Sequence, residues 1–187
     1  MQALVVVDAQ NEFSAGGLRP VPNHAEALDA IRRRVAGARS EGRPVAWVRH
    51  HNRPDERPGF APGSWGAAFS PSLGPEPGRA VETDLVKDVV GAFTGTDLGR
   101  WLEGVGADDI LLVGFFAHMC VSTTAREAVM RGLRVAVDPD GTGGFPIAHP
   151  LLGETSAEEV CRTALLHLSA LGVAITPRCD RHHGDAP

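Results

Sequence analysis

The chain has 187 residues, a formal net charge of −5 and a sequence pI near 5.9, so it offers no basic surface for the phosphates of a nucleic acid or of an anionic membrane. Its length suits one domain, which we expect over residues 1–177, followed by a polar tail over residues 178–187. Three cysteines without a CxxC pair, and an N-terminus without a cationic leader, predict a cytoplasmic location with reduced thiols.

Short apolar runs alternate with longer helical patterns along the whole chain. The runs predict buried strands at Ala3–Val7, Pro44–Arg49, Ile110–Gly114, Leu133–Asp138 and Val173–Thr176. The helical patterns predict helices at about 25–40 with Asn23 as the cap, at 97–102, at 119–131, and from a Ser156/Glu159 capping box to about Leu171, with glycines closing them. This alternation predicts a parallel sheet with helices on both faces and functional side chains at the carboxyl ends of its strands.

The stretch from about residue 52 to residue 79 holds six prolines and five glycines, too many for a regular element. A loop of this length inside a compact domain is usually a functional cover or an interface segment. Trp65 lies within it, where a large aromatic side chain is either a lid over a pocket or a contact to another subunit.

Three residues of different chemistry are placed to meet at one edge of the predicted sheet. Asp8 directly follows the first strand, although an aspartate there often only caps a turn. Cys120 stands at the start of the helix that follows the apolar run at Ile110–Gly114, where helix amides lower the pKa of a thiol; a buried structural cysteine is the alternative. Lys87 is the only lysine beside 17 arginines, which indicates either nucleotide bias or a position that needs a compact ammonium. Together they would supply a nucleophile, a proton acceptor and a stabilising charge.

Other features of the chain favour simpler interpretations. Cys161 lies on an apolar helical face and is predicted to be a buried structural thiol, and Cys179, His182 and His183 belong to a polar terminus rather than a metal site. A thiol redox protein would also place a cysteine at a helix start, but the chain has no CxxC pair. The glycines at 104 and 106 follow a helix and lack a third glycine, so the dinucleotide-binding fingerprint fails.

Three segments carry a resemblance to a known family. They are residues 3–13 (ALVVVDAQNEF), 87–98 (KDVVGAFTGTDL) and 114–126 (GFFAHMCVSTTAR), and in this order they resemble the isochorismatase-like cysteine hydrolase superfamily, which includes nicotinamidases and N-carbamoylsarcosine amidases. The resemblance runs from Leu4 to about Leu171. It implies a three-layer α/β/α sandwich with a Rossmann-like, mainly parallel sheet of six strands. It also implies a cis peptide bond between Phe115 and Phe116, and a catalytic triad of Asp8, Lys87 and Cys120.

The resemblance also implies a reaction on a small molecule without a cofactor. Asp8 would take the thiol proton of Cys120, and the thiolate would attack an amide or carbamoyl carbonyl to give a thioester that water then cleaves. The backbone N–H groups of Phe116 and Cys120 would form the oxyanion hole. Phe13, Trp65 and Phe116 would line the pocket, and His118 would either touch substrate or make a supporting hydrogen bond. A homo-oligomer is expected, with the loop around Trp65 long enough to reach a neighbour.

The chain departs from the pattern of the metal-dependent nicotinamidases. Those enzymes bind a divalent metal through a carboxylate and histidines after the second strand, whereas this chain has His50 and His51 there, with Asp55 as the nearest carboxylate. Adjacent histidines on an extended chain point to opposite sides, so we expect no metal and at most one pocket histidine. Metal-dependent nicotinamidase and isochorismatase-type vinyl ether hydrolysis stay open as alternatives, and the presence of Cys120 favours C–N cleavage.

Overall fold

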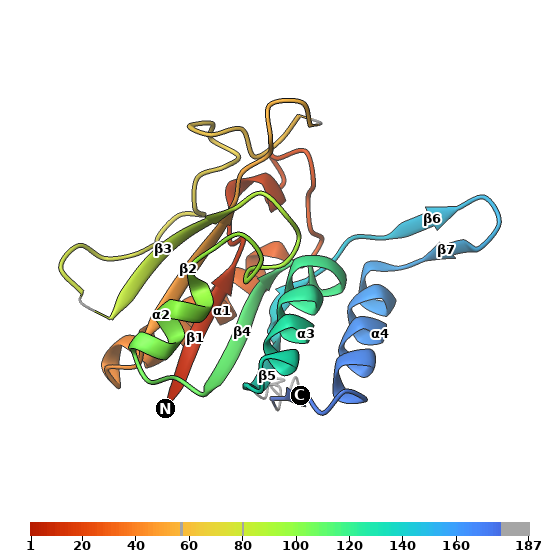
Figure 1. Ribbon diagram of the computed structural model, residues 1–187. Coiled ribbons are helices and arrows are strands. Elements are labelled where there is room, and N and C mark those ends of the chain that lie inside the picture. Colours follow the sequence, from red (N-terminus) through yellow and green to blue (C-terminus); the bar gives the residue numbers. More distant parts are fainter. Residues whose placement is uncertain (57, 80, 177–187) are drawn as a thin grey trace, which may run out of the picture.

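The computed structural model describes residues 1–56, 58–79 and 81–176, so the predicted tail over 178–187 lies outside the described residues. Its main sheet has six parallel strands in the order β3-β2-β1-β4-β5-β8 (Figure 1). Their bounds are β1 Gln2–Val7, β2 Val45–His50, β3 Glu82–Lys87, β4 Asp109–Phe115, β5 Arg134–Gly143 and β8 Ala174–Ile175. The predicted parallel sheet of six strands is confirmed, with Lys87 at the end of an edge strand.

Helices cover both faces of this sheet, which confirms the predicted three-layer sandwich (Figure 1). Helix α1 (His24–Ser40) packs on one face, and α2 (Leu98–Gly104), α3 (Ser122–Met130) and α4 (Ala157–Ser169) pack on the other. Successive side chains of a strand point to opposite faces, so β1 gives Val5 and Val7 to one core and Leu4 and Val6 to the other. Two apolar layers therefore hold the sheet rigidly between them.

Local signals set most of the element ends. The capping box at Ser156 and Glu159 is confirmed, with the Glu159 N–H donating to the Ser156 hydroxyl at 3.2 Å. Asn23 precedes α1 as predicted, but its side chain makes no cap; its Nδ2 instead donates to the Thr142 carbonyl oxygen at 3.0 Å. Tertiary contact with β5 thus replaces the predicted local hydrogen bond. The predicted helix at 119–131 is also only partly right, because a π-helical turn over Ala117–Val121 precedes α3.

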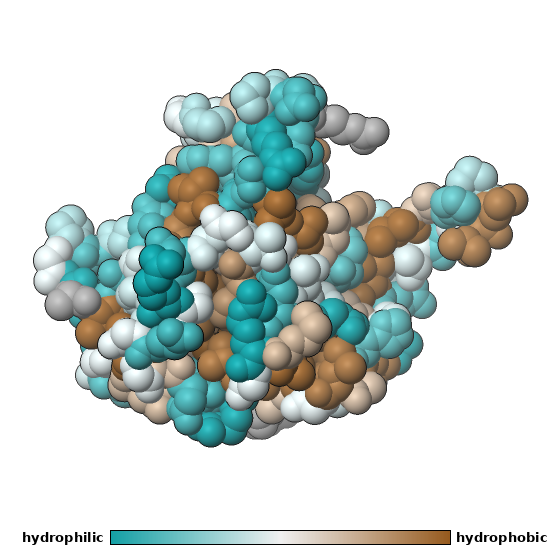
Figure 2. All heavy atoms as spheres, viewed as in Figure 1, coloured by the Kyte–Doolittle hydropathy of each residue, from teal (hydrophilic) through white to brown (hydrophobic). Residues whose placement is uncertain are grey.

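A second, smaller sheet was not predicted from the sequence. Strands β6 (Ile147–His149) and β7 (Gly153–Thr155) form an antiparallel hairpin between β5 and α4. The hairpin projects from the body of the molecule in Figure 1, and Figure 2 shows apolar surface at its far end. Within the described residues, no helix is both long enough and apolar enough to cross a membrane.

Candidate active site

Asp8, Lys87 and Cys120 come together at the carboxyl edge of the sheet. Asp8 follows β1 directly, Lys87 is the last residue of β3, and Cys120 lies in the π-helical turn after β4. Asp8 adopts the left-handed region at φ 53°, an unfavourable backbone geometry that surrounding structure must enforce. Gly114 permits the close approach of β4 to β1, since a Cβ there would stand 1.8 Å from the Val7 carbonyl oxygen. Strand ends, rather than flexible loops, therefore position the first two of these groups.

The ammonium of Lys87 occupies the centre of the site. Its Nζ lies 2.8 Å from Asp8 Oδ2 and 3.4 Å from Cys120 Sγ, and it donates to the Val89 carbonyl oxygen at 3.2 Å. The Lys87 side chain is wholly buried and that of Asp8 is 1% exposed, whereas Cys120 is partly exposed. A cation with no access to water thus lies between the Asp8 carboxylate and the Cys120 thiol.

Burial dominates the protonation of the site. Burial, and then the charge of Asp8, raise the pKa of the Cys120 thiol to about 12, against the opposing effect of the Lys87 charge. Burial disfavours the Lys87 ammonium, but the charges of Asp8 and Cys120 outweigh it and raise the pKa of Lys87. The predicted depression of the Cys120 pKa by a helix N-terminus is therefore wrong. At neutral pH the site therefore holds a neutral thiol beside the ion pair of Lys87 and Asp8.

His50 extends this cluster by one residue. It pairs with Lys87 across β2 and β3, and its Nδ1 lies 3.3 Å from Lys87 Nζ while its Nε2 lies 3.0 Å from Asn52 Oδ1. Burial, and then the charge of Lys87, lower the pKa of His50, so the ring is neutral and its Nδ1 accepts from the ammonium. The charges that act on His51 are those of Arg49 and Asp84, on the other side of the strand. Only one of the two histidines belongs to the site.

A metal ion does not fit the residues at the end of β2. Both ring nitrogens of His50 already face partners, Lys87 and Asn52, and a cation bound at Nδ1 would stand against the ammonium. Within the described residues, no group of three or more His, Cys, Asp or Glu side chains is arranged to hold a metal ion. The residues around His50 therefore favour the Lys87 ammonium, rather than a metal ion, as the partner of its Nδ1.

The turn that carries Cys120 is built on the carbonyl of Phe116. The peptide bond between Phe115 and Phe116 is cis, as the resemblance predicted. The Phe116 carbonyl oxygen accepts from the N–H groups of Met119 and Val121, both at 3.1 Å. These bonds fold residues 116–121 into a tight turn that presents Cys120 above the end of β4, beside the backbone predicted to form the oxyanion hole.

The predicted pocket residues separate into two groups. Phe13 and Phe116 are almost fully buried and pack edge to face with centroids 4.6 Å apart, and His118 stacks on Phe116 at 5.5 Å. The ring nitrogens of His118 have no hydrogen-bond partner within the described residues, so the supporting hydrogen bond considered for it is not seen. Trp65 is 57% exposed and rests on the turn at Gly16. The structure therefore brings Phe13, Phe116 and His118 into one aromatic cluster, and Trp65 lies apart from their contacts.

Three residues for which the sequence predicted no role hold the long loop in place. Gln10, fully buried, donates to the carbonyl oxygens of His50 and Ala67 and accepts from the His50 N–H. Asn11 donates to the Trp65 carbonyl oxygen at 3.0 Å. Glu12 lies under the loop, where a Cβ on Gly66 would stand 2.1 Å from its Oε2. Their position directly after Asp8 was the signal, because polar residues that continue a buried strand need partners in the fold.

Helix α3 fixes the segment that follows Lys87. The Thr124 hydroxyl accepts from the Ala92 N–H at 3.1 Å, and the Glu127 carboxylate accepts from the Phe93 N–H and from the Thr94 hydroxyl. The same helix begins just after Cys120. One rigid element thus ties the segment after the lysine to the turn that holds the thiol.

Comparison with known proteins identifies the family. A model described as the isochorismatase domain matches residues 2–164, and the chain belongs to the isochorismatase family of hydrolases. It is 37% identical over 140 residues, 75% of this chain and 71% of the relative, to the secreted isochorismatase effector Isc1 of Verticillium dahliae. It is 33% identical over 165 residues, 77% of this chain and 87% of the relative, to the nicotinamidase/pyrazinamidase of Mycobacterium tuberculosis.

A solved structure supports the same assignment across the whole fold. The N-carbamoylsarcosine amidase of Thermoplasma acidophilum matches with a TM-score of 0.77 at 26% sequence identity, covering 98% of this chain and 99% of that one. The resemblance stated from the three sequence segments is therefore confirmed.

Proposed function

We propose that this protein is a cysteine hydrolase that cleaves the C–N bond of a small amide or carbamoyl compound through a thioester on Cys120. One observation carries the proposal: the buried Lys87 ammonium lies within 2.8 Å of the Asp8 carboxylate and 3.4 Å of the Cys120 thiol. This is the arrangement that nucleophilic catalysis needs, a nucleophile with an adjacent base and a third group that orients both. The names of two of its relatives, a nicotinamidase/pyrazinamidase and an N-carbamoylsarcosine amidase, agree with C–N cleavage.

Asp8 is the base and acid of the proposed reaction. It takes the thiol proton of Cys120 as Sγ bonds to the substrate carbonyl carbon, and it returns that proton to the amine as the C–N bond breaks. It then deprotonates the water that attacks the thioester, and the proton restores the thiol. Because the pKa of Cys120 is raised to about 12, the thiolate exists only while Lys87 balances its charge during the attack.

The turn after β4 supplies the proposed oxyanion hole. The backbone N–H groups of Phe116 and Cys120 face the carbonyl oxygen of the substrate, and each such donor contributes roughly 3 kcal/mol to transition-state stability. Phe13, Phe116 and His118 form the apolar wall against which a flat amide packs, with Trp65 at the outer end of the covering loop. The wall selects small planar substrates over extended ones.

A panel of small amides, ureas, N-carbamoyl compounds and one vinyl ether tests the proposal. Ammonia or amine release should accompany a transient mass increase on the intact protein equal to the acyl group, and Cys120→Ala should lose both. Vinyl ether cleavage that survives Cys120→Ala would favour isochorismatase-type chemistry instead. Repeated oxidation by peroxide and recovery by a thiol reductant, without hydrolysis of any compound, would favour a thiol redox protein.

We also propose that the protein acts in the cytoplasm as a homo-oligomer. The location rests on its three cysteines without a CxxC pair, and the assembly on its resemblance to oligomeric enzymes. Cell fractionation tests the first, with recovery in the secreted fraction as the contrary result, since one relative is named as a secreted effector. Analytical ultracentrifugation tests the second.

A further inference from the structure

The hairpin between β5 and α4 exposes an apolar surface that its own chain does not cover. Residues 146–154, called the arm from here on, are all exposed, and among them Leu151 and Leu152 are 88% and 86% exposed. Strands β6 and β7 pair only with each other, from Ile147↔Thr155 to His149↔Gly153. The arm points away from the body of the molecule, with apolar surface at its far end (Figures 1 and 2).

An exposed apolar hairpin of this kind is expected to pack against another surface. A lone two-stranded hairpin is marginally stable in water because it buries little apolar area. The arm is especially unfavourable in water as an isolated hairpin, since its nine residues are mostly apolar and carry one acidic group, Glu154. Adjacent exposed leucines at a projecting tip mark an interaction site rather than ordinary surface.

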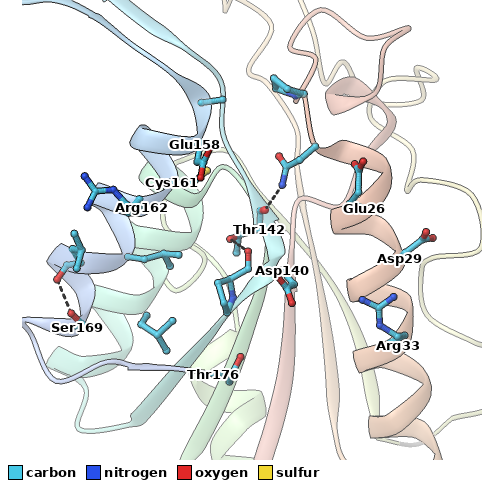
Figure 3. A pocket seen from close by; sticks show the side chains of 17 residues that line it. Glu26, Asp29, Arg33, Asp140, Thr142, Glu158, Cys161, Arg162, Ser169 and Thr176 are labelled. Atoms are coloured by element: carbon cyan, nitrogen blue, oxygen red, sulfur yellow. Dashed lines mark hydrogen bonds between the residues drawn. The ribbon is translucent and has the colours of Figure 1, made fainter. Parts of the chain in front are cut away.

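The same chain offers a groove of matching character. A groove of about 880 Å³ lies between α1, β5 and α4 (Figure 3). It exists because β8 pairs with only Ala136 and Val137, which leaves the rest of β5 open on that side. Its apolar lining includes Pro139, Leu165, Leu166 and Ile175, and Leu166 is 53% exposed. None of the triad residues lines it.

We propose that the arm of one copy docks in this groove of a second copy, and that the second arm docks in the first groove, giving a two-fold homodimer. Arm and groove belong to one chain, yet the arm tip is exposed in the single chain, so the arm does not fill the groove of its own copy. A reciprocal exchange uses the same two surfaces on both copies and leaves none of them open, which closes the assembly at two.

The two surfaces together have the size that a stable dimer needs. Standard interfaces bury about 800 Å² per partner, from roughly 20 to 30 residues a side. Each copy would bring the nine arm residues and the 17 residues that line the groove. The leucines of the arm tip would form the apolar centre, and the charged residues of α1 and α4 at the groove margin, Glu26, Asp29, Arg33, Glu158 and Arg162, would form a polar rim.

Charged substitutions at the arm tip test the proposed interface between the two copies. Sedimentation at micromolar concentration should show a dimer for the wild type and a monomer for Leu151→Glu combined with Leu152→Glu, with the dissociation constant raised at least a hundredfold. Met130→Glu is the matched control, because Met130 is 78% exposed at the end of α3 and far from the arm in the chain. A double variant that stays dimeric, or a control that dissociates equally, would overturn the proposal.

A native thiol in the groove allows a direct test of docking. Cys161 lines the groove, so Leu151→Cys with a short bis-maleimide should give a dimer on a denaturing gel, with mass spectrometry joining positions 151 and 161. Cys161→Ser in the same chain should abolish this product, and Met130→Cys should not form one with Cys161.

The outcomes separate this inference from the homo-oligomer on which it rests. A wild-type dimer without the 151–161 product would overturn docking of the arm in the groove and leave the homo-oligomer standing. A wild-type monomer at every concentration would overturn both. A 151–161 product confined to single chains, shown by mixing two tagged forms, would mean that the arm folds back onto its own copy.

Discussion

Cys120 and Cys161 differ in their charged surroundings rather than in burial, since Cys161, predicted to be buried, is partly exposed like Cys120. Both thiols are partly buried, and burial raises the pKa of the first to about 12 and of the second to about 11. A shifted pKa therefore does not distinguish them. The charged neighbours do: Cys120 lies beside the buried ion pair of Lys87 and Asp8, whereas burial alone acts on Cys161. The proposed reaction depends on a base and a counter-charge placed next to a thiol that stays protonated at rest.

The largest effect should come from removing the Cys120 thiol, and removal of the Cys161 thiol is the matched comparison. Cys120→Ala deletes the nucleophile and should lower turnover by roughly 10⁴-fold or more, a loss typical of catalytic nucleophiles. Cys161→Ala removes a thiol whose pKa is shifted by burial alone and should keep turnover within about twofold. The measurement is kcat/KM for both variants, with thermal unfolding to confirm folding. Equal losses would end the distinction between the two cysteines.

The counter-charge is tested by Lys87→Arg. A guanidinium carries the same charge but is larger and planar, and the buried space between Asp8 and Cys120 is filled by a compact ammonium. A misplacement of about 1 Å can lower the rate on the order of a hundredfold. We expect a folded protein with turnover reduced by about that factor, measured beside its melting temperature. Turnover near that of the wild type would remove Lys87 from the mechanism.

Asp8→Asn should lower turnover while it lowers the pKa of Cys120, so the variant separates the role of Asp8 as a base from its effect on the thiol. Turnover should fall because the base is lost, yet alkylation of Cys120 by iodoacetamide at pH 8 should become several-fold faster. The reason is that the Asp8 charge raises the pKa of Cys120, so its removal lowers that pKa and increases the thiolate fraction at any pH below it. Alkylation of Cys161 serves as the internal control and should not change. Slower alkylation of Cys120 would show that Asp8 does not act on the thiol as described.

The two adjacent histidines offer a smaller and more selective test. His50→Leu keeps bulk but removes the acceptor for the Lys87 ammonium, and we expect kcat to fall about tenfold with little change in KM. His50→Asn restores an acceptor near the Nδ1 position and should recover most of kcat. His51→Leu makes the same chemical change on the other side of the strand and should stay within about twofold. A loss shared by the Leu and Asn variants of His50 would indicate packing rather than positioning.

Removal of metal should have the smallest effect of all. Because His50 faces the Lys87 ammonium and Asn52, dialysis against a chelator should leave hydrolysis within about twofold of its starting rate. The assay is turnover before and after dialysis, with added zinc, iron or manganese in parallel. Activity lost on chelation and restored by one of these ions would place the protein with the metal-dependent nicotinamidases.

Much of the fold could be predicted because its signals are local. Apolar runs, the capping box at Ser156 and the glycine closures gave most strands and helices to within a few residues. The exceptions are the edge strand β3, which no apolar run marks, the continuation of β5 to Gly143 and the missed arm. The arm escaped because Pro146, Pro150 and Gly153 interrupt a segment too short and too exposed for a period to show. Hydrophobic patterns indicate elements that pack against a core, and the arm packs against no core in its own chain.

The sequence by itself determined which chemistry was available: one lysine, one aspartate after the first strand and one cysteine after the apolar run at 110–114. Only the tertiary structure decided how these groups behave. Burial and the Asp8 charge raise the Cys120 pKa that the helix start was predicted to lower, and the pairing of β2 with β3 chooses His50 over His51 as the neighbour of Lys87. The physical reason is that acidity and contact depend on which groups the fold removes from water together, and residues 8, 50, 87 and 120 meet only when the sheet forms.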